Sequence, residues 1–238
     1  MEYLQICPVS LASEVIAERW TPLILREIVL FDRHHFTEIQ HGVGRISQSL
    51  LSARLKTLEE AGVIERRPNR SGRGWEYYPT PAGAELEQVL NDLGIWAQHW
   101  IELKQEHCDP AYLMTMVYDL LRPDRLPRTP TTVRFEFTVQ PKVYWLVMGG
   151  ERPELCYYDP GRDIDMVVTV DEQEFAKVIL GRARYEDAVS AGKIRLEGPP
   201  HLVRAFPSWL YPSRFARYSR NPAPAVGAAV TLGAAAPA

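Results

Sequence analysis

Side chains able to contact DNA bases stand at helical spacing between Ser47 and Ala61. Leucines recur every three or four residues in this stretch, as on the buried side of an amphipathic helix, at Leu51, Leu55 and Leu58. The opposite side would carry small hydroxyl, amide and basic groups, at Gln48, Ser49, Ser52, Ala53 and Lys56. Hydroxyls and amides can hydrogen-bond to base edges in a major groove without preventing close approach. On periodicity alone, the same pattern also fits a helix that is merely solvated on one side.

Basic residues gather around this stretch, although the whole chain has a formal net charge of -3. Seven lysines and arginines, against three acidic residues, lie between Arg45 and Arg73. Arg70 and Arg73 belong to a turn-rich segment, PNRSGRG, which separates two strand patterns at 64–67 and 75–78. Cations at the tip of such a hairpin, and at Arg45, suit phosphate groups or a minor groove.

The order of the surrounding elements is the order that a winged helix requires. Apolar spacing predicts two short helices that face the core, over 11–16 and 22–28, and a third over 36–43. The helix that carries the polar side then begins at Ser47, a good N-cap, and stops at Gly62. This context favours a DNA-reading helix over a merely solvated one.

A continuous apolar stripe at helical spacing follows from residue 81 to residue 101. It extends over about five turns, which is more apolar surface than a small winged helix covers alone. We therefore expect a homodimer whose interface includes Leu86, Leu90, Leu93 and Trp100.

The chain of 238 residues exceeds the commonest size of one domain, so two domains are expected. Residues 1–106 are assigned to the winged helix and dimer surface, and the proline-rich residues 107–130 to a linker with a helical segment. Residues 131–218 alternate in hydrophobicity as strands do and then return to helical spacing, which predicts an α+β domain. The Ala/Pro/Gly-rich residues 219–238 predict a disordered tail. The fold class of the whole chain is α+β.

Five segments of the first hundred residues together form a recognisable pattern. They are CPV from Cys7, ERWTPLILREI from Glu18, HFTEI from His35, ISQSLLSARLKTLEEAGVIERR from Ile46 and WEYYPTPAGAEL from Trp75. This pattern resembles the HxlR family of bacterial transcriptional regulators. The resemblance implies that residues 47–61 are the recognition helix, residues 66–78 the wing and the terminal helices the dimer surface. One position departs from the family, which usually has a basic residue where this chain has His35.

One block of the second half, DIDMVVTVDEQEFAKVILGRARYEDAVSAGKIRLEGPPHLVRAF from Asp163, orders its elements in a particular way. A strand, a helix ending in Gly-Arg, a second helix, the segment GKIRLEG and a further helix follow one another. This order resembles the sterol carrier protein type-two fold, an α+β domain that holds apolar molecules between its sheet and helices. The resemblance implies a ligand pocket lined by Phe135, Phe137, Trp145, Val168, Phe175, Ile179, Leu202, Phe206 and Trp209. A plain hydrophobic core is the other interpretation of these residues.

The sequence offers little support for other kinds of site. Cys7, Cys108 and Cys156 are too widely spaced for a disulfide framework or a thiolate metal site, and the histidines within 34–41 lack further ligands. No nucleophile with an adjacent base stands out, so we expect no metal, no cofactor and no enzyme. The chain has neither an apolar run of about 18–20 residues nor a leader-like start, and we expect a cytoplasmic protein without a membrane partner.

Together these predictions describe a homodimeric, operator-binding regulator whose second domain binds a small hydrophobic ligand. Three alternatives stay open. A thiol switch at Cys7 would make DNA binding depend on oxidants, although no basic residue lies within ten residues of it and a small buried side chain is the simpler interpretation. A second domain that serves only assembly would have a dry core and no ligand response. A lipid carrier would transfer lipid without binding an operator.

Overall fold

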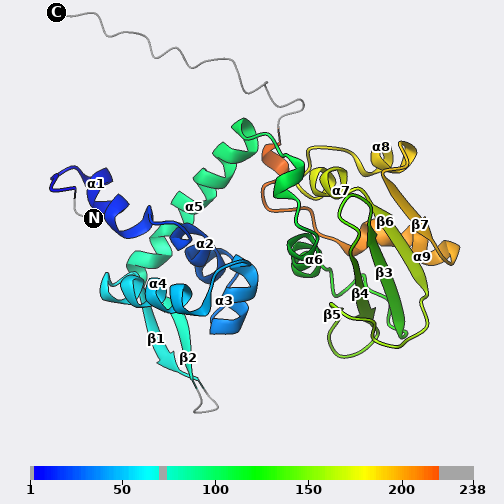
Figure 1. Cartoon of the computed structure of the whole chain (residues 1–238), viewed down its shortest axis with the longest axis horizontal. Helices are drawn as coiled ribbons and strands as arrows, with labels where there is room; N and C mark the ends of the chain where they lie inside the picture. Colours follow the sequence, from blue (N-terminus) through cyan, green and yellow to red (C-terminus); the bar gives the residue numbers. More distant parts are fainter. Residues whose placement is uncertain (1–2, 70–73, 220–238) are drawn as a thin grey trace, which may run out of the picture. The chain divides into compact units, whose positions relative to one another are not determined.

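The computed structural model describes residues 3–69 and 74–219 and divides into two compact units, Met1–Gly94 and Ile95–Ala238 (Figure 1). The helices of the first unit are α1 (Pro8–Ile16), α2 (Thr21–Leu25), the π-helical turn η1 (Arg26–Leu30), α3 (Phe36–Val43) and α4 (Gln48–Glu60). An antiparallel hairpin follows, made of β1 (Ile64–Pro68) and β2 (Trp75–Pro79). The long helix α5 (Pro81–Trp100) begins in the first unit and continues past its boundary.

One apolar core joins α2, η1, α3 and α4 to the base of the hairpin. The prediction that the first short helix faces this core is wrong for most of its length. α1 buries none of its residues, Leu11 is 53% exposed, and only Val15 and Ile16 at its end pack against the core. Apolar spacing reports that a helix has an apolar side, but it does not say what covers that side.

The turn between α3 and α4 requires Gly44, whose φ of 85° lies in the left-handed region that favours glycine. Ser47 then caps α4, because its hydroxyl accepts a 3.3 Å hydrogen bond from the Leu50 amide. Gly62, at a φ of 70°, follows the last turn of α4 and lets the chain turn into β1. The start and stop predicted for this helix are confirmed.

The second unit is built around one five-stranded sheet. Its strands are β3 (Thr131–Phe137), β4 (Val143–Met148), β5 (Glu154–Cys156), β6 (Met166–Val170) and β7 (Ile194–Glu197), in the spatial order β5-β4-β3-β6-β7. β3 and β6 run parallel, and the other neighbouring strands are antiparallel. The helices of this unit are η2 (Gln105–His107), α6 (Pro110–Asp119), α7 (Glu172–Ile179), α8 (Tyr185–Ser190), α9 (Pro200–Ala205), η3 (Phe206–Trp209) and η4 (Ala216–Tyr218).

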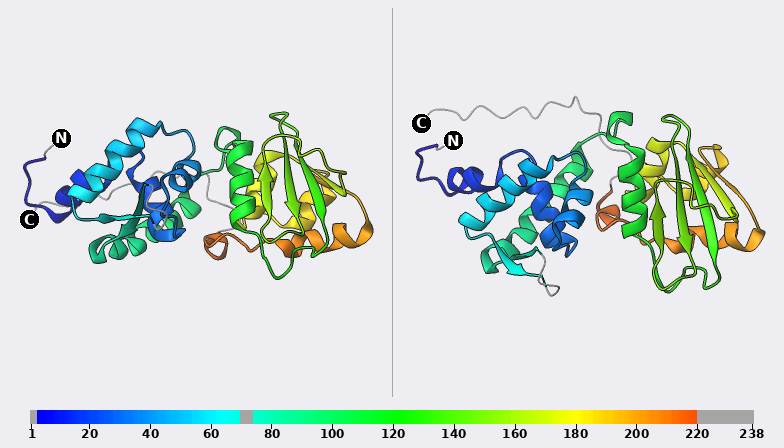
Figure 2. Two further views of the ribbon diagram at one scale, coloured as in Figure 1. Left: turned by 90° about the horizontal axis from the view of Figure 1, so that it is seen from below. Right: turned by 60° about the horizontal axis from the view of Figure 1, so that its bottom comes forward.

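The helices of the second unit gather on one face of the sheet, as both views of Figure 2 show. On β3, Val133, Phe135 and Phe137 are at most 4% exposed and share a core with α6, α7 and α9. The residues between them, Arg134 and Glu136, are half-buried and point to the other face, because side chains alternate along a strand.

Two assignments made from the sequence differ from this architecture. The segment 107–130, expected as a linker, belongs to the second unit, since α6 buries Leu113, Met114 and Val117 in its core. Proline-rich composition marks the ends of elements as well as the ends of domains. The further helix expected after the segment GKIRLEG, over residues 201–209, divides into α9 and η3, because the ring at Pro207 removes a backbone donor. The tail expected to be disordered lies outside the described residues, apart from Ser219.

Candidate nucleic-acid interface

α4 separates buried leucines from exposed polar side chains. Leu51, Leu55 and Leu58 are at most 1% exposed, so they fix one side of the helix in the core. The side predicted to read DNA is exposed along its length, at Gln48, Ser49, Ser52, Ala53 and Lys56. A fixed helix with short polar side chains presents hydrogen-bonding groups in the way that a major groove requires.

A buried carboxylate of η1 supports the end of α3. Glu27 is fully buried, accepts a 2.6 Å hydrogen bond from Arg26 Nε and forms an ion pair with Arg33. A second nitrogen of Arg26 donates to the Gly42 carbonyl at 2.9 Å. A Cβ atom at Gly42 would overlap the Glu27 carboxylate, so the last turn of α3 depends on a glycine there. Sequence reasoning missed this network, because nothing in the sequence around Glu27 indicates that its carboxylate is buried.

The β1–β2 hairpin carries two arginines that lie over aromatic rings. Arg66 lies 4.6 Å from the ring centre of Trp75, and its Nε is 3.0 Å from Glu59 Oε1 of α4. Arg67 lies 4.5 Å from the ring centre of Tyr78. Arg66 therefore links the end of α4 to both strands and holds the hairpin, which we call the wing, against that helix.

This combination of a helix pair and a wing has counterparts among known proteins. The family model for HxlR-like helix-turn-helix proteins matches residues 15–105. The HTH-type transcriptional regulator YvaP of Bacillus subtilis is 33% identical over 116 residues, which span 48% of this chain and 99% of YvaP. The chain belongs to the HxlR-like helix-turn-helix family. It is a transcriptional regulator, and the resemblance stated from the sequence is confirmed for the first 105 or so residues.

Other transcriptional regulators have a similar sequence identity to this chain. The HTH-type transcriptional regulator Rv3095 of Mycobacterium tuberculosis is 34% identical over 120 residues, spanning 45% of this chain and 75% of that protein. The solved structure of the reduced form of the transcriptional regulator YodB from B. subtilis has 30% sequence identity and a TM-score of 0.36, covering 42% of this chain and all of YodB. Helix-turn-helix regulators bind DNA, which agrees with operator DNA as the expected partner.

The basic residues of the HxlR-like unit differ in their surroundings. Lys56 and Arg45 are exposed, and the Lys56 ammonium is 3.5 Å from Glu60 Oε1. Arg54, which the prediction did not include, pairs with Glu18 at 2.8 Å. The other two predicted phosphate contacts, Arg70 and Arg73, lie outside the described residues.

His35 stands at the position where the HxlR motif usually has a basic residue. It is the N-cap of α3, and its backbone N–H donates to Glu38 Oε2 at 3.2 Å. Its Nε2 is 3.7 Å from Glu76 Oε1 of the wing. His35 therefore connects the start of α3 with the second strand of the wing.

The four residues predicted for a dimer interface divide into two pairs on α5. Leu86 and Leu90 are half-buried and pack against the core of the first unit. Leu93 and Trp100 are 52% and 43% exposed. Val89, which the prediction omitted, is similarly exposed. The exposed row on α5 is thus offset from the predicted stripe, because the core covers the inner part of that stripe.

Eight of the nine residues predicted to line a ligand pocket lie together in one closely packed core and are at most 8% exposed. Ring centres are 6.1 Å apart between Phe135 and Phe206 and 5.5 Å apart between Phe206 and Trp209. The ninth residue, Trp145, does not belong to this core. It stands opposite Arg134 in the β3–β4 register, so it lies on the other face of the sheet from Phe135.

Cys7 is exposed at the N-cap of α1, which corrects the expectation of a buried side chain. The backbone amides of Ser10 and Val9 at this helix start lower the pKa of its thiol. Burial raises the thiol pKa of both Cys108 and Cys156. Of the three cysteines, Cys7 is the one most readily converted to a thiolate.

Within residues 3–69 and 74–219, no three or more His, Cys, Asp or Glu side chains are grouped so as to hold a metal ion. No helix in the described part of the chain has both the length and the apolar character needed to cross a membrane.

Proposed function

We propose that this regulator binds operator DNA as a homodimer, with α4 in the major groove and the wing on neighbouring phosphates. The observation that carries the proposal is the exposed polar row of α4 opposite three fully buried leucines. In helix-turn-helix proteins the second helix of the pair reads base edges, and its N-terminal residues make the contacts. Gln48, Ser49 and Ser52 occupy that half of α4, while Lys56 and Arg45 suit phosphates.

Capture of sheared genomic DNA on the immobilised full chain, followed by sequencing, tests this proposal. The recovered fragments should share a two-fold symmetric sequence with half-sites about 10–10.5 base pairs apart, or a multiple of that spacing. The Gln48→Ala, Ser52→Ala double variant should recover a different or weaker motif. Fragments without any common sequence would show that operator recognition lies elsewhere.

The proposed dimer interface is the exposed row of α5. Val89, Leu93, Trp96 and Trp100 recur at intervals of three or four residues and are each 43–53% exposed. Large apolar side chains repeated along one side of a helix are typical of a surface that another protein covers. A second copy of the chain is the partner we propose.

For the second unit, we propose a sterol-carrier-like domain that binds a small hydrophobic molecule and thereby changes operator affinity. The order β6, α7, α8, β7 and α9 after Asp163 supports the resemblance on which this rests. Such a molecule can regulate DNA binding only if it prefers one state of the dimer over another. Since the predicted lining residues pack closely, an interior guest would have to displace part of this core.

Native mass spectrometry of the freshly purified full chain tests the dimer and the ligand together. We expect the mass of two chains plus a retained molecule that organic solvent removes. Two chains without an added mass would instead favour a second unit that serves only assembly.

A thiol switch at Cys7 is the second candidate function. The exposure of Cys7 and the lowered pKa of its thiol favour this alternative. If this function is correct, the oxidant diamide should release the natural chain from its operator. The Cys7→Ser variant should stay bound to the operator in the presence of diamide. The matched variant Cys156→Ser should keep the response, because burial raises the pKa of that thiol.

A further inference from the structure

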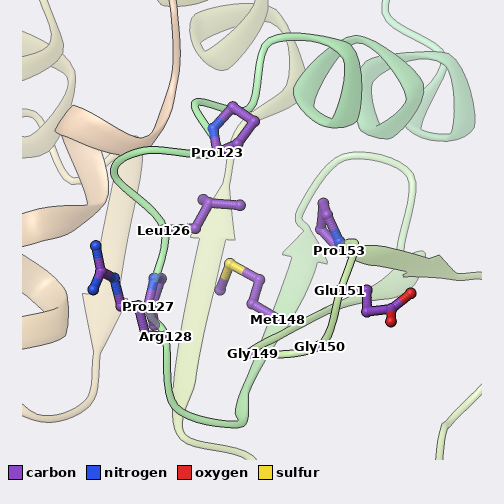
Figure 3. Close-up of a pocket in the computed structure, with 9 residues that line it drawn as sticks. All are labelled: Pro123, Leu126, Pro127, Arg128, Met148, Gly149, Gly150, Glu151 and Pro153. Carbon is purple, nitrogen blue, oxygen red and sulfur yellow. The ribbon is translucent and has the colours of Figure 1, made fainter.

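A separate pocket of about 230 Å³ lies where β4 ends, outside the closely packed set that the sequence predicted as ligand-binding (Figure 3). One wall is the segment 123–128, and the other is the turn from β4 to β5 with Met148 and Pro153. No role in the proposed function uses these residues.

Backbone contacts fix both walls of the pocket in place. The Arg122 amide donates to the Trp209 carbonyl at 2.7 Å, which holds the start of the 123–128 wall. Tyr118 of α6 donates its hydroxyl hydrogen to the Pro153 carbonyl at 3.0 Å. Gly149, at a φ of 94°, lies so close to the Thr129 carbonyl that a Cβ atom would overlap it. The pocket is therefore formed before any ligand enters.

Carbon and sulfur atoms share the lining of this pocket with polar atoms, and the charged groups stand at its edge. Leu126 and Met148 point toward one another across the middle, whereas the charged ends of Arg128 and Glu151 extend outward on opposite sides (Figure 3). Three prolines contribute ring carbons to the lining and lack the N–H that other residues would offer. A guest inside thus meets polar atoms as well as carbon and sulfur surfaces.

We infer that the pocket binds a small molecule with a single uncharged aromatic ring. Its volume is below the roughly 300–1,000 Å³ of pockets for drug-sized ligands, so it suits one ring and not a fused sterol-like system. The Met148 thioether provides the sulfur contact that aromatic rings favour. The inference concerns the same sensing role as the proposed ligand, but at another place, and it does not depend on DNA binding.

Methyl NMR of the full chain labelled with 13C-methyl methionine tests this inference with p-cresol as the probe. The chain has five methionines; Met148, Met114 and Met166 are all buried in the core of the second unit, and of these three only Met148 is among the residues that line the pocket. We expect p-cresol to shift the Met148 methyl signal in a saturable way through its ring current, with Met114 and Met166 unchanged. Shifts of Met114 and Met166 instead would overturn the inference and favour the interior site of the proposed function. No saturable shift of any signal would overturn it as well.

Two variants and one second probe complete the design. Leu126→Trp fills the pocket and should lower the affinity for p-cresol at least tenfold. The control is Leu196→Trp on β7, where the leucine is also half-buried, and it should change that affinity less than twofold. If Leu126→Trp disturbs the Met114 signal, the variant Pro123→Ala, at an exposed position, is used in its place. We expect Pro123→Ala to lower the affinity for p-cresol about threefold. The saturated analogue 4-methylcyclohexanol should displace p-cresol at least fivefold less effectively. Equal displacement, or p-cresol binding that survives both variants, would contradict an aromatic site here.

Discussion

Lys56 and the small polar residues of α4 are expected to affect DNA binding in different ways. Replacing Lys56 by alanine should weaken binding to all sequences alike and reduce the slope of log affinity against log salt by about one, because it removes one phosphate contact. The neighbouring Glu60 already offsets part of this charge, so the affinity loss should stay below about tenfold. Anisotropy titrations at several salt concentrations measure both quantities. Lys142→Ala, a change of the same charge in the second unit, should leave the slope unaltered.

The three cysteines should differ in how their alkylation depends on pH. The amides of Ser10 and Val9 lower the pKa of the Cys7 thiol, so its thiolate forms at a lower pH than in an ordinary cysteine. Burial acts in the opposite direction at Cys156. Iodoacetamide labelling followed by mass spectrometry should therefore give Cys7 a rate that reaches half its maximum at the lowest pH of the three. A later midpoint for Cys7 than for Cys156 would contradict this.

At the scale of elements, Gly42 determines how α3 packs on η1. Alanine at this position would displace the buried carboxylate of Glu27 from Arg33, and we expect a loss of about 3 kcal/mol in the free energy of unfolding. Urea denaturation followed by circular dichroism measures it. Gly150→Ala is the control, because a Cβ atom there meets only an ordinary contact at 3.8 Å. Equal stability of Gly42→Ala and the natural chain would mean that the Glu27 network rearranges without cost.

The last turn of α5 is held by Arg182. Its guanidinium donates to the Ile101 carbonyl at 2.7 Å, to the Ala97 carbonyl at 3.2 Å and to Gln98 Oε1 at 2.9 Å. Removing these charged donors by Arg182→Ala leaves the carbonyls of the helix end unpaired, so amide hydrogen exchange there should accelerate roughly tenfold or more. The exposed Arg184 provides the control, since its alanine variant loses only a surface pair with Glu186.

Elements with a strong local signal could be predicted from the sequence. α4 follows from three leucines at helical spacing between Ser47 and Gly62, and β3 follows from strict alternation. The apolar spacing of α1 predicted that this helix faces the core. That prediction failed for most of the helix, because what covers an apolar side is a property of the whole fold. The face of Trp145 depended on the pairing register of β4 with β3, and a short apolar strand does not reveal its register.

At the scale of the whole molecule, a homodimer should depend on the exposed side of α5. Leu93→Glu places a charge in the middle of that row and should yield monomers in analytical ultracentrifugation. The variant chain should still fold, because Leu93 is 52% exposed within a single chain. Val189→Glu, an equivalent change at an exposed valine of α8, should remain dimeric. A dimer that survives Leu93→Glu would move the interface to another surface.

The parallel pairing of β3 with β6 has a consequence for synthesis on the ribosome. β3 can pair with β4, which follows it closely in the chain. The other edge of β3 stays unpaired until β6 has been synthesised, since Val133 pairs with Met166. At about 5–20 residues per second, the intervening chain takes roughly two to seven seconds to emerge. For that time an apolar strand has one unpaired edge, on which neighbouring nascent chains can aggregate. The winged helix, made of contacts close in sequence, can be complete before then, so the yield of the intact chain should depend on chaperones that shield β3 until β6 arrives.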